Sequence, residues 1–431
     1  MKSIIKILTV YFIFSCCNMY AENAELSLDD CIKTALQNNN KIKISNKNII
    51  ISKNAGKQIW NNFEPRLDVE GAVNYRYKEL TASFGDQEFV LGEKEVETMR
   101  ASLMVPVYDF GSASELNKSF DLQYENSKLK LERTQKEIIY GVTIAYFRLL
   151  EAQKFEILAL NSLKLAETFL NTMIALFKEG LITSYKVEDF KLSLTQKNEA
   201  LNLARNNRDL AAGNLNRWMG QRVETQILIK DILEYIPWTP KFNEVLENAL
   251  NNRTELKILN NQIEIAKSVY SSEEGANLPK MFIFADYNYS SSDSMLSQNS
   301  LTGGIGVKYN VFDGGINRSL INRKKEQTEI AKDIFADGVA DISIELKKTC
   351  ADIFDALEKL KTAIEQKNLF YKNENITQRF FNEGLVSSTE LLSARNKSLF
   401  GNAIYFQSLY QYHQAVAGYS LASGVAKENR S

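Results

Sequence analysis

The chain has 431 residues, of which 44% are hydrophobic and 24% charged, and its formal net charge at pH 7 is −1. Chains of this length usually contain more than one hydrophobic core, and this composition is that of an ordinary folded protein. Without an excess of basic residues the chain has no electrostatic footprint for a phosphate backbone, so we expect no binding to nucleic acid.

Residues 1–21 have the pattern of an export signal. Basic residues precede the apolar run 7–14, and a short polar stretch then ends at Ala21. A lipoprotein signal ending before Cys16 is the alternative, because the residues before this cysteine approximate the context that precedes a lipidated cysteine. No later window has enough consecutive apolar residues for a transmembrane helix, so a membrane-embedded part would consist of strands.

The rest of the sequence contains two related copies of one pattern. Residues 28–66 align with 242–280 without a gap, and four blocks of the first copy recur in the same order in the second: 35–39 as 249–253, 63–65 as 277–279, 107–111 as 311–315, and 177–181 as 381–385. Because the order is preserved, the sequence predicts an internal duplication. We place the first structural repeat at 22–236 and the second at 237–431, with Pro237 and Pro240 between them.

Each copy contains two segments in which apolar and polar residues alternate strictly. They are 67–77, 99–108, 281–289 and 301–311. Segments of about ten residues with this alternation and with tyrosines near their ends are typical of transmembrane β-strands. A soluble sandwich would show the same alternation and is the alternative. In lipid, four strands cannot close, so subunits would have to pool them; two, three or four chains would supply about eight, twelve or sixteen strands.

A long helix follows the strands in each copy. Between Gly111 and Lys178 there is no proline, so one helix of about 100 Å is predicted. A seam of apolar residues, with one threonine in the second copy, repeats every seven positions: Ile138, Ala145, Ala152, Ala159, Ala166 and Met173 in the first copy, and Ile342, Thr349, Ala356, Ala363 and Phe370 in the second. This spacing predicts close, left-handed coiled-coil packing. We expect left-handed C-caps at Gly180 and Gly384, followed by return helices.

Chemistry typical of enzymes is missing from the sequence. His413 is the only histidine, which excludes a multi-histidine metal site and removes the usual general base. The segment 302–308 is superficially similar to a phosphate loop, but it alternates as a strand. Cys31 and Cys350 lie in amphipathic patterns and are interpreted as buried free thiols. The polar runs 78–96 and 290–300 are interpreted as extracellular loops. We therefore expect no enzymatic activity and no cofactor.

Taken together, these blocks resemble the TolC-like outer-membrane efflux protein family, the outer membrane factors. The residues that carry the resemblance are the openings at Ala35 and Ala249, the prolines Pro65 and Pro279, the Val-x-Asp-x-Gly motifs ending at Gly111 and Gly315, and the Glu-Gly-Leu turns 179–181 and 383–385. The resemblance implies an α+β membrane protein. It would be a homotrimer with a 12-stranded outer-membrane β-barrel, four strands per chain, continued by a long α-helical coiled-coil tunnel in the periplasm.

The same resemblance implies a function and partners. The protein would be the outer-membrane exit channel of a tripartite efflux or type I secretion system, in contact with outer-membrane lipid. It would be a passive gated duct, opened when a periplasmic adaptor and an inner-membrane pump or ABC transporter dock. A trimeric coiled-coil spacer or adhesin anchored by a β-barrel is the alternative. The alternation of strands and helices in both copies favours the duct, and the sequence does not identify its cargo.

The resemblance also assigns roles to residues at the helix turns. Gly180, Leu181, Gly384 and Leu385 match the turns that adaptors recognise in the family. Glu390 falls where the family often has an acidic residue that narrows the pore, but Ser393 stands where a second acid can occur, and Lys186 is the first-copy counterpart of Glu390. A ring of charge at a narrow point dominates ion selectivity. The alternative is that these are ordinary solvated charges at helix starts.

Overall fold

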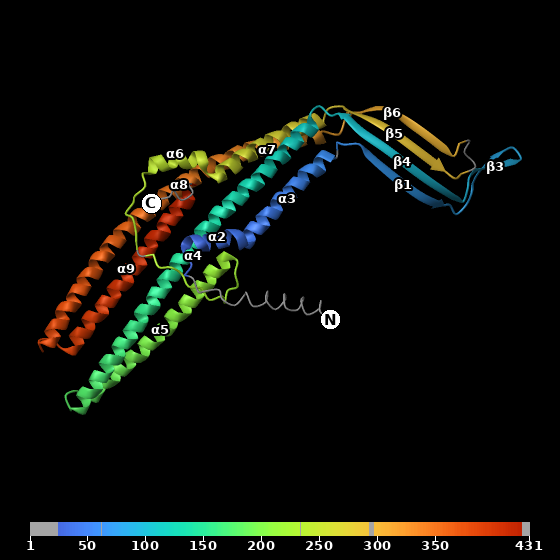
Figure 1. Ribbon diagram of the computed structural model, residues 1–431. Coiled ribbons are helices and arrows are strands. Elements are labelled where there is room, and N and C mark those ends of the chain that lie inside the picture. Colours follow the sequence, from blue (N-terminus) through green and yellow to red (C-terminus); the bar gives the residue numbers. More distant parts are fainter. Residues whose placement is uncertain (1–24, 62, 233, 293–296, 425–431) are drawn as a thin grey trace, which may run out of the picture. The chain divides into compact units, whose positions relative to one another are not determined.

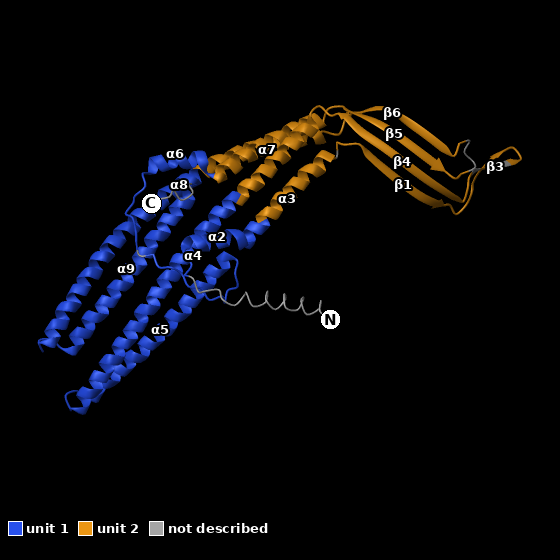
Figure 2. Cartoon of the chain, in the orientation of Figure 1, with its two compact units in different colours: residues 1–44, 132–253, 340–431 blue, residues 45–131, 254–339 orange. Residues whose placement is uncertain are grey.

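The computed structural model describes residues 25–61, 63–232, 234–292 and 297–424, apart from the side chains at 88, 89 and 91. The predicted signal 1–21 and Cys16 lie outside the described residues. The chain forms two compact units, one made of residues 1–44, 132–253 and 340–431, and one of 45–131 and 254–339 (Figure 2). Both predicted repeats contribute to both units. Among the described residues, no helix is long and apolar enough to cross a membrane.

The second unit contains a four-stranded antiparallel sheet (Figure 1). Its strands are β1 (Arg66–Tyr75), β4 (Glu95–Tyr108), β5 (Lys280–Ser290) and β6 (Asn299–Lys308), in the order β1-β4-β5-β6. All four predicted strands are therefore confirmed, although β6 ends three residues before its predicted end. The two copies meet where β4 pairs with β5, and β1 and β6 are left as the two edges of the sheet.

The two faces of the sheet differ in chemistry, as the alternation predicts. The register places Val69, Ala101, Tyr287 and Leu301 in one row across the apolar face. The next row, on the opposite face, consists of Glu70, Arg100, Asn288 and Ser300. Every residue of β1 is exposed, so neither of its faces is covered by this chain.

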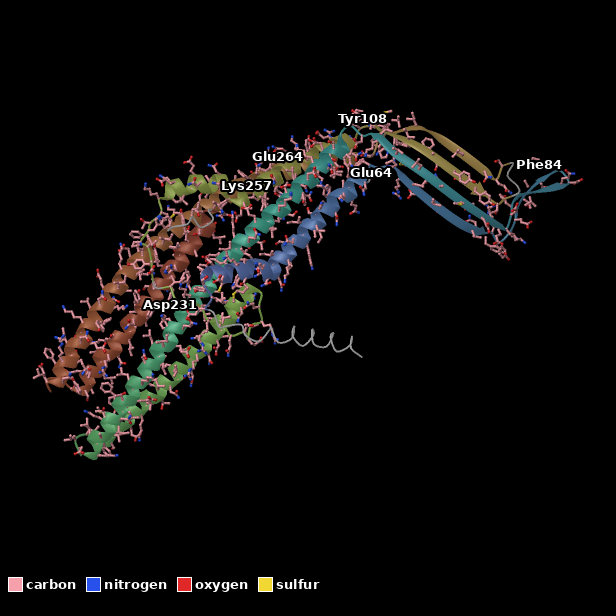
Figure 3. The ribbon with its side chains drawn as sticks, viewed as in Figure 1. Glu64, Phe84, Tyr108, Asp231, Lys257 and Glu264 are labelled. Atoms are coloured by element: carbon pink, nitrogen blue, oxygen red, sulfur yellow. The ribbon has the colours of Figure 1, made fainter. Side chains whose placement is uncertain are left out.

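The run 78–96 is more ordered than a loop. It forms a separate hairpin of β2 (Leu80–Phe84) and β3 (Gln87–Gly92), and its last two residues belong to β4. Gly85 has a φ of 66°, which the tight turn requires and which glycine adopts without steric penalty. Phe84 lies in this hairpin, exposed to solvent (Figure 3). This second strand pair was not predicted from the sequence, and the extracellular position of the run stays a prediction.

The aspartate of each Val-x-Asp-x-Gly motif caps the start of a long helix. These helices are α4 (Ser112–Lys178) and α8 (Ile316–Asn382), each of 67 residues. The carboxylate of Asp109 accepts hydrogen bonds from the N–H groups of Gly111, at 3.1 Å, and Ala113, at 2.6 Å. Asp313 accepts equivalent bonds in the second copy, and they lower the pKa of its carboxyl group. The motif is therefore a strand-to-helix turn that caps the helix.

The remaining helices also match between the copies. They are α2 (Leu28–Asn38), α3 (Asn40–Asn61) and α5 (Ser184–Met219) in the first copy, and α6 (Phe242–Asn252), α7 (Thr254–Ala276) and α9 (Ser388–Ala422) in the second. In the first unit, α4 and α5 form one antiparallel hairpin and α8 and α9 form another (Figure 1). The predicted seven-residue pattern is buried there, including Ile138, Ala145, Ala166, Ile342, Ala356 and Ala363.

The connector, the segment between α5 and α6, consists of residues 220–241 apart from the undescribed residue 233. It is held against the helices of the first unit. Leu26 pairs with Ile229 in a parallel bridge, and the Tyr146 hydroxyl donates to the carbonyls of Leu26 and Lys230. Asp231, labelled in Figure 3, forms an ion pair with Lys154 on α4 and accepts a hydrogen bond from Tyr410 on α9 at 3.0 Å. One carboxylate thus links the connector to a helix of each copy.

The prediction of buried free thiols is confirmed for Cys31 and only in part for Cys350. Both cysteines are free; Cys31 is fully buried, and burial raises the pKa of its thiol to about 12. Cys350 is only partly buried, and desolvation raises its pKa as well. The ring of His413 stacks on Phe147, with 4.6 Å between the ring centroids, so it lies in a helix seam.

Candidate functional site: the turns between long and return helices

The two turns that the sequence singles out have the same backbone geometry. In the first, the N–H of Leu181 donates to the carbonyl of Leu176 at 3.0 Å, and Gly180 has a φ of 73°. In the second, Leu385 donates to Phe380 at 2.8 Å, and the φ of Gly384 is 76°. These bonds define a Schellman C-cap, in which glycine occupies the left-handed position. The predicted caps are confirmed in both copies.

Each turn presents a leucine to solvent. Leu181 is 70% exposed and Leu385 is 68% exposed. A Cβ atom built on either turn glycine would have no neighbour within 4 Å. The backbone beside each leucine is therefore open as well, so a partner can approach both the apolar side chain and the main chain. An exposed apolar side chain on a rigid, capped turn is suited to insertion into a groove of another protein.

The starts of the two return helices differ, and the difference follows from one residue. At α9, the side chain of Ser387 accepts from the N–H of Glu390, while the Glu390 carboxylate accepts from the N–H of Ser387 at 2.7 Å. This reciprocal pair is a capping box. It lowers the pKa of Glu390, because the backbone N–H of Ser387 stabilises the ionised carboxylate. The charge of Glu390 is thus held at the start of the helix.

The first copy cannot make this cap. Thr183 occupies the equivalent N-cap position at α5 and makes no side-chain cap hydrogen bond. Lys186 stands three residues later, where the second copy has Glu390, and a lysine cannot accept a hydrogen bond from a backbone N–H. Within the described part of the chain, no hydrogen bond or ion pair joins Lys186 to Glu390. The sequence difference is therefore also a difference in how the two turns are stabilised.

Ser393 lies one turn further along α9 from Glu390. It lines a shallow hollow of about 430 Å³ together with Leu392, Asn396 and Lys397. Asn396 and Lys397 were not predicted as site residues, although they lie three and four residues after Ser393, which is the spacing of neighbours on one helix face. Ser393 thus shares a surface with the cation of Lys397, whereas Glu390 is not among the residues that line this hollow.

Residues 245–425 match the family model for outer membrane efflux proteins. No curated protein matches the chain in sequence. Among solved structures, the chain is similar to the Campylobacter jejuni CmeC outer membrane channel, with a TM-score of 0.79 and 13% identity over 92% of this chain and 85% of that one. It is also similar to the outer membrane protein VceC from Vibrio cholerae, with a TM-score of 0.74 and 12% identity over 92% and 96% of the two chains.

A further structure is the open state of the Neisseria gonorrhoeae MtrE outer membrane channel, with a TM-score of 0.74 and 14% identity over 92% of this chain and 88% of that one. These structures share the fold of this chain over nearly its whole described length. The family match falls on the second copy, whose elements the first copy reproduces in the same order. The second copy therefore matches the outer membrane efflux protein family, and the chain as a whole shares the fold of these outer membrane channels.

Proposed function

We propose that three copies of this chain form one channel, in which twelve strands close a barrel in the outer membrane and the helices form a duct in the periplasm. The observation that carries the proposal is the sheet, which has unlike faces and two unpaired edges, β1 and β6. An open strand edge leaves backbone N–H and C=O groups unsatisfied in lipid, so the sheet has to be closed by other copies. The similar fold of the CmeC and MtrE channels supports the same assembly.

The channel is a passive duct whose inner end is controlled by partners. Leu181 and Leu385 dock a periplasmic adaptor, which connects the duct to an inner-membrane pump or ABC transporter of an efflux or type I secretion system. The equal geometry and exposure of the two turns support this, because an adaptor that meets both copies needs two similar surfaces. The function of a spacer or adhesin does not require an exposed leucine on a capped turn in both copies.

Two measurements test the function. The purified protein in a planar lipid bilayer is expected to conduct ions in discrete steps, and a protein that conducts neither alone nor with its adaptor would exclude a duct. In cells, a photo-crosslinking amino acid at Leu181 or Leu385 is expected to capture one periplasmic protein. Leu203 is the matched control, since it is 60% exposed in the middle of α5 and lies away from the turn. Equal capture from Leu203 would contradict docking at the turns.

Glu390 and Lys186 are expected to influence ion selectivity in opposite directions. Glutamine at position 390 removes the charge but can still accept the capping hydrogen bond, so Glu390→Gln changes the field and keeps the helix start. We expect Glu390→Gln to lower the preference of the pore for cations and Lys186→Gln to raise it, because charges at a constriction dominate selectivity. The reversal potential of single channels under a KCl gradient measures this. Unchanged potentials in both variants would show that these are only solvated helix-start charges.

A further inference from the structure

The polar face of the sheet is not polar throughout. At the end nearest the helices, β5 places Phe282 and Phe284 on the same face as Asp286 and Asn288, because residues two apart in a strand share a face. Both phenylalanines are only half exposed. Their two ring centroids are 6.1 Å apart. This face therefore begins with an aromatic patch and becomes charged and hydrogen-bonding further along.

Two glycines of β6 provide the space for these rings. A Cβ atom at Gly306 would stand 2.5 Å from the ring of Phe282, and one at Gly304 would stand 3.3 Å from the ring of Phe284. The register agrees, since Phe282 pairs with Gly306 and Phe284 with Gly304. The two rings occupy the space that side chains at positions 304 and 306 would fill. The arrangement gives a firm apolar surface, and it explains the glycines of segment 302–308.

The next row carries two cations directly opposite each other. Lys280 and Lys308 are register partners at the end of the β5–β6 pair, on the face that carries Phe282 and Gly306. Like charges directly opposite in a sheet are destabilising. Neither lysine has a hydrogen-bond or ion-pair partner among the described residues. The nearby carboxylates of Asp109 and Asp313 accept from N–H groups at the starts of the helices.

From this placement we propose that Phe282 and Phe284, with Lys280 and Lys308, form a binding site for an amphipathic organic anion. The apolar body of the ligand lies on the two rings, and its carboxylate or sulfonate group is held between the two lysines. An anion there relieves the repulsion between them, and charge-assisted hydrogen bonds to lysine are among the stronger ones. The binding site itself is inferred from the sheet alone. That the bound anion is a transported molecule rests on the proposed function, in which this face of the sheet lines the lumen of the duct.

The direct test is binding of pyrenesulfonate to the assembled protein in nanodiscs of phosphatidylcholine, followed by fluorescence anisotropy against empty nanodiscs. Pyrenyltrimethylammonium, with the same ring and the opposite charge, is the comparison. We expect the sulfonate to bind more tightly than the ammonium compound, and Lys280→Ala with Lys308→Ala to weaken it roughly tenfold or more. Phe282→Ala with Phe284→Ala should weaken both probes.

Ile283→Ala is the matched control, because Ile283 lies between the two phenylalanines on the opposite face of the sheet. It should change neither affinity. Equal affinity for both probes, or equal loss in the control, overturns the proposal. Displacement of pyrenesulfonate by phosphatidylglycerol in the nanodiscs also overturns it, since the lysines would then hold a lipid headgroup. Single-channel conductance of the same variants separates this outcome from failure of the duct: a conducting protein without the binding site refutes only the site.

Discussion

Cysteines placed on β1 and β6 are expected to link different copies of the chain by disulfide bonds. Each variant in a series combines Val69→Cys on β1 with one cysteine at an apolar-face position of β6. In at least one of these variants, cross-linked chains should form a ladder of products on a non-reducing gel. Leu301 and Ile305 are the central positions of that series, and both are strongly exposed in the single chain. The reason is that each edge has unpaired backbone groups, and in lipid another strand has to satisfy them.

The top of the ladder gives the number of chains in the barrel. Three chains would stop it at a covalent trimer, whereas two or four chains would stop it at a dimer or a tetramer. The control is Ala101→Cys with Tyr287→Cys, whose Cα atoms are register partners on β4 and β5 of one chain. That pair should form a bond within the monomer. If the control pair forms its disulfide bond but no β1–β6 variant gives an intermolecular product, the edges are not joined and the proposed barrel is wrong.

The duplication made most of the fold predictable from the sequence. The two long helices begin and end at equivalent residues, 112 and 178 in the first copy and 316 and 382 in the second, as the matched blocks require. Seven-residue and two-residue periods are local signals, and they identified the helix seams and the strands without knowledge of tertiary contacts. The turn glycines were predictable for the same reason, since the left-handed C-cap needs only the residues around it.

The features that the sequence did not predict depend on contacts between distant segments. The connector is fixed through Asp231, whose partners Lys154 and Tyr410 are far from it in the sequence and carry no motif. The site at Phe282 depends on the exact pairing of β5 with β6, because a shift of one residue would place each ring against a different neighbour. The opposite charges of Lys186 and Glu390 at equivalent positions were visible in the sequence. The capping role of Glu390 became evident only from its hydrogen bond with the N–H of Ser387 in the structure.

A second large effect is expected from alanine at Gly220, the C-cap of α5. Gly220 has a φ of 71°, and a Cβ atom there would stand 2.7 Å from the carbonyl oxygen of Asn38 and 3.1 Å from the amide nitrogen of Asn39. These are backbone atoms at the corner between α2 and α3. The corner is fixed further by the side-chain amide of Asn39, which donates to the carbonyl of Trp218 at 2.7 Å. The backbone at this corner therefore cannot move away from a Cβ atom at position 220 without breaking the hydrogen bond between Asn39 and Trp218.

Gly384→Ala provides the control for backbone strain alone. Its φ of 76° is nearly the same, but a Cβ atom there would meet nothing within 4 Å. Both substitutions lose about 1–2 kcal/mol from the left-handed conformation, and Gly220→Ala loses about 1–3 kcal/mol more from the clash. The melting temperature of the assembled protein, followed by the helical circular dichroism signal at one protein concentration, should fall further for Gly220→Ala than for Gly384→Ala. Equal shifts would mean that the corner between α2 and α3 moves freely and that the end of α5 does not hold it.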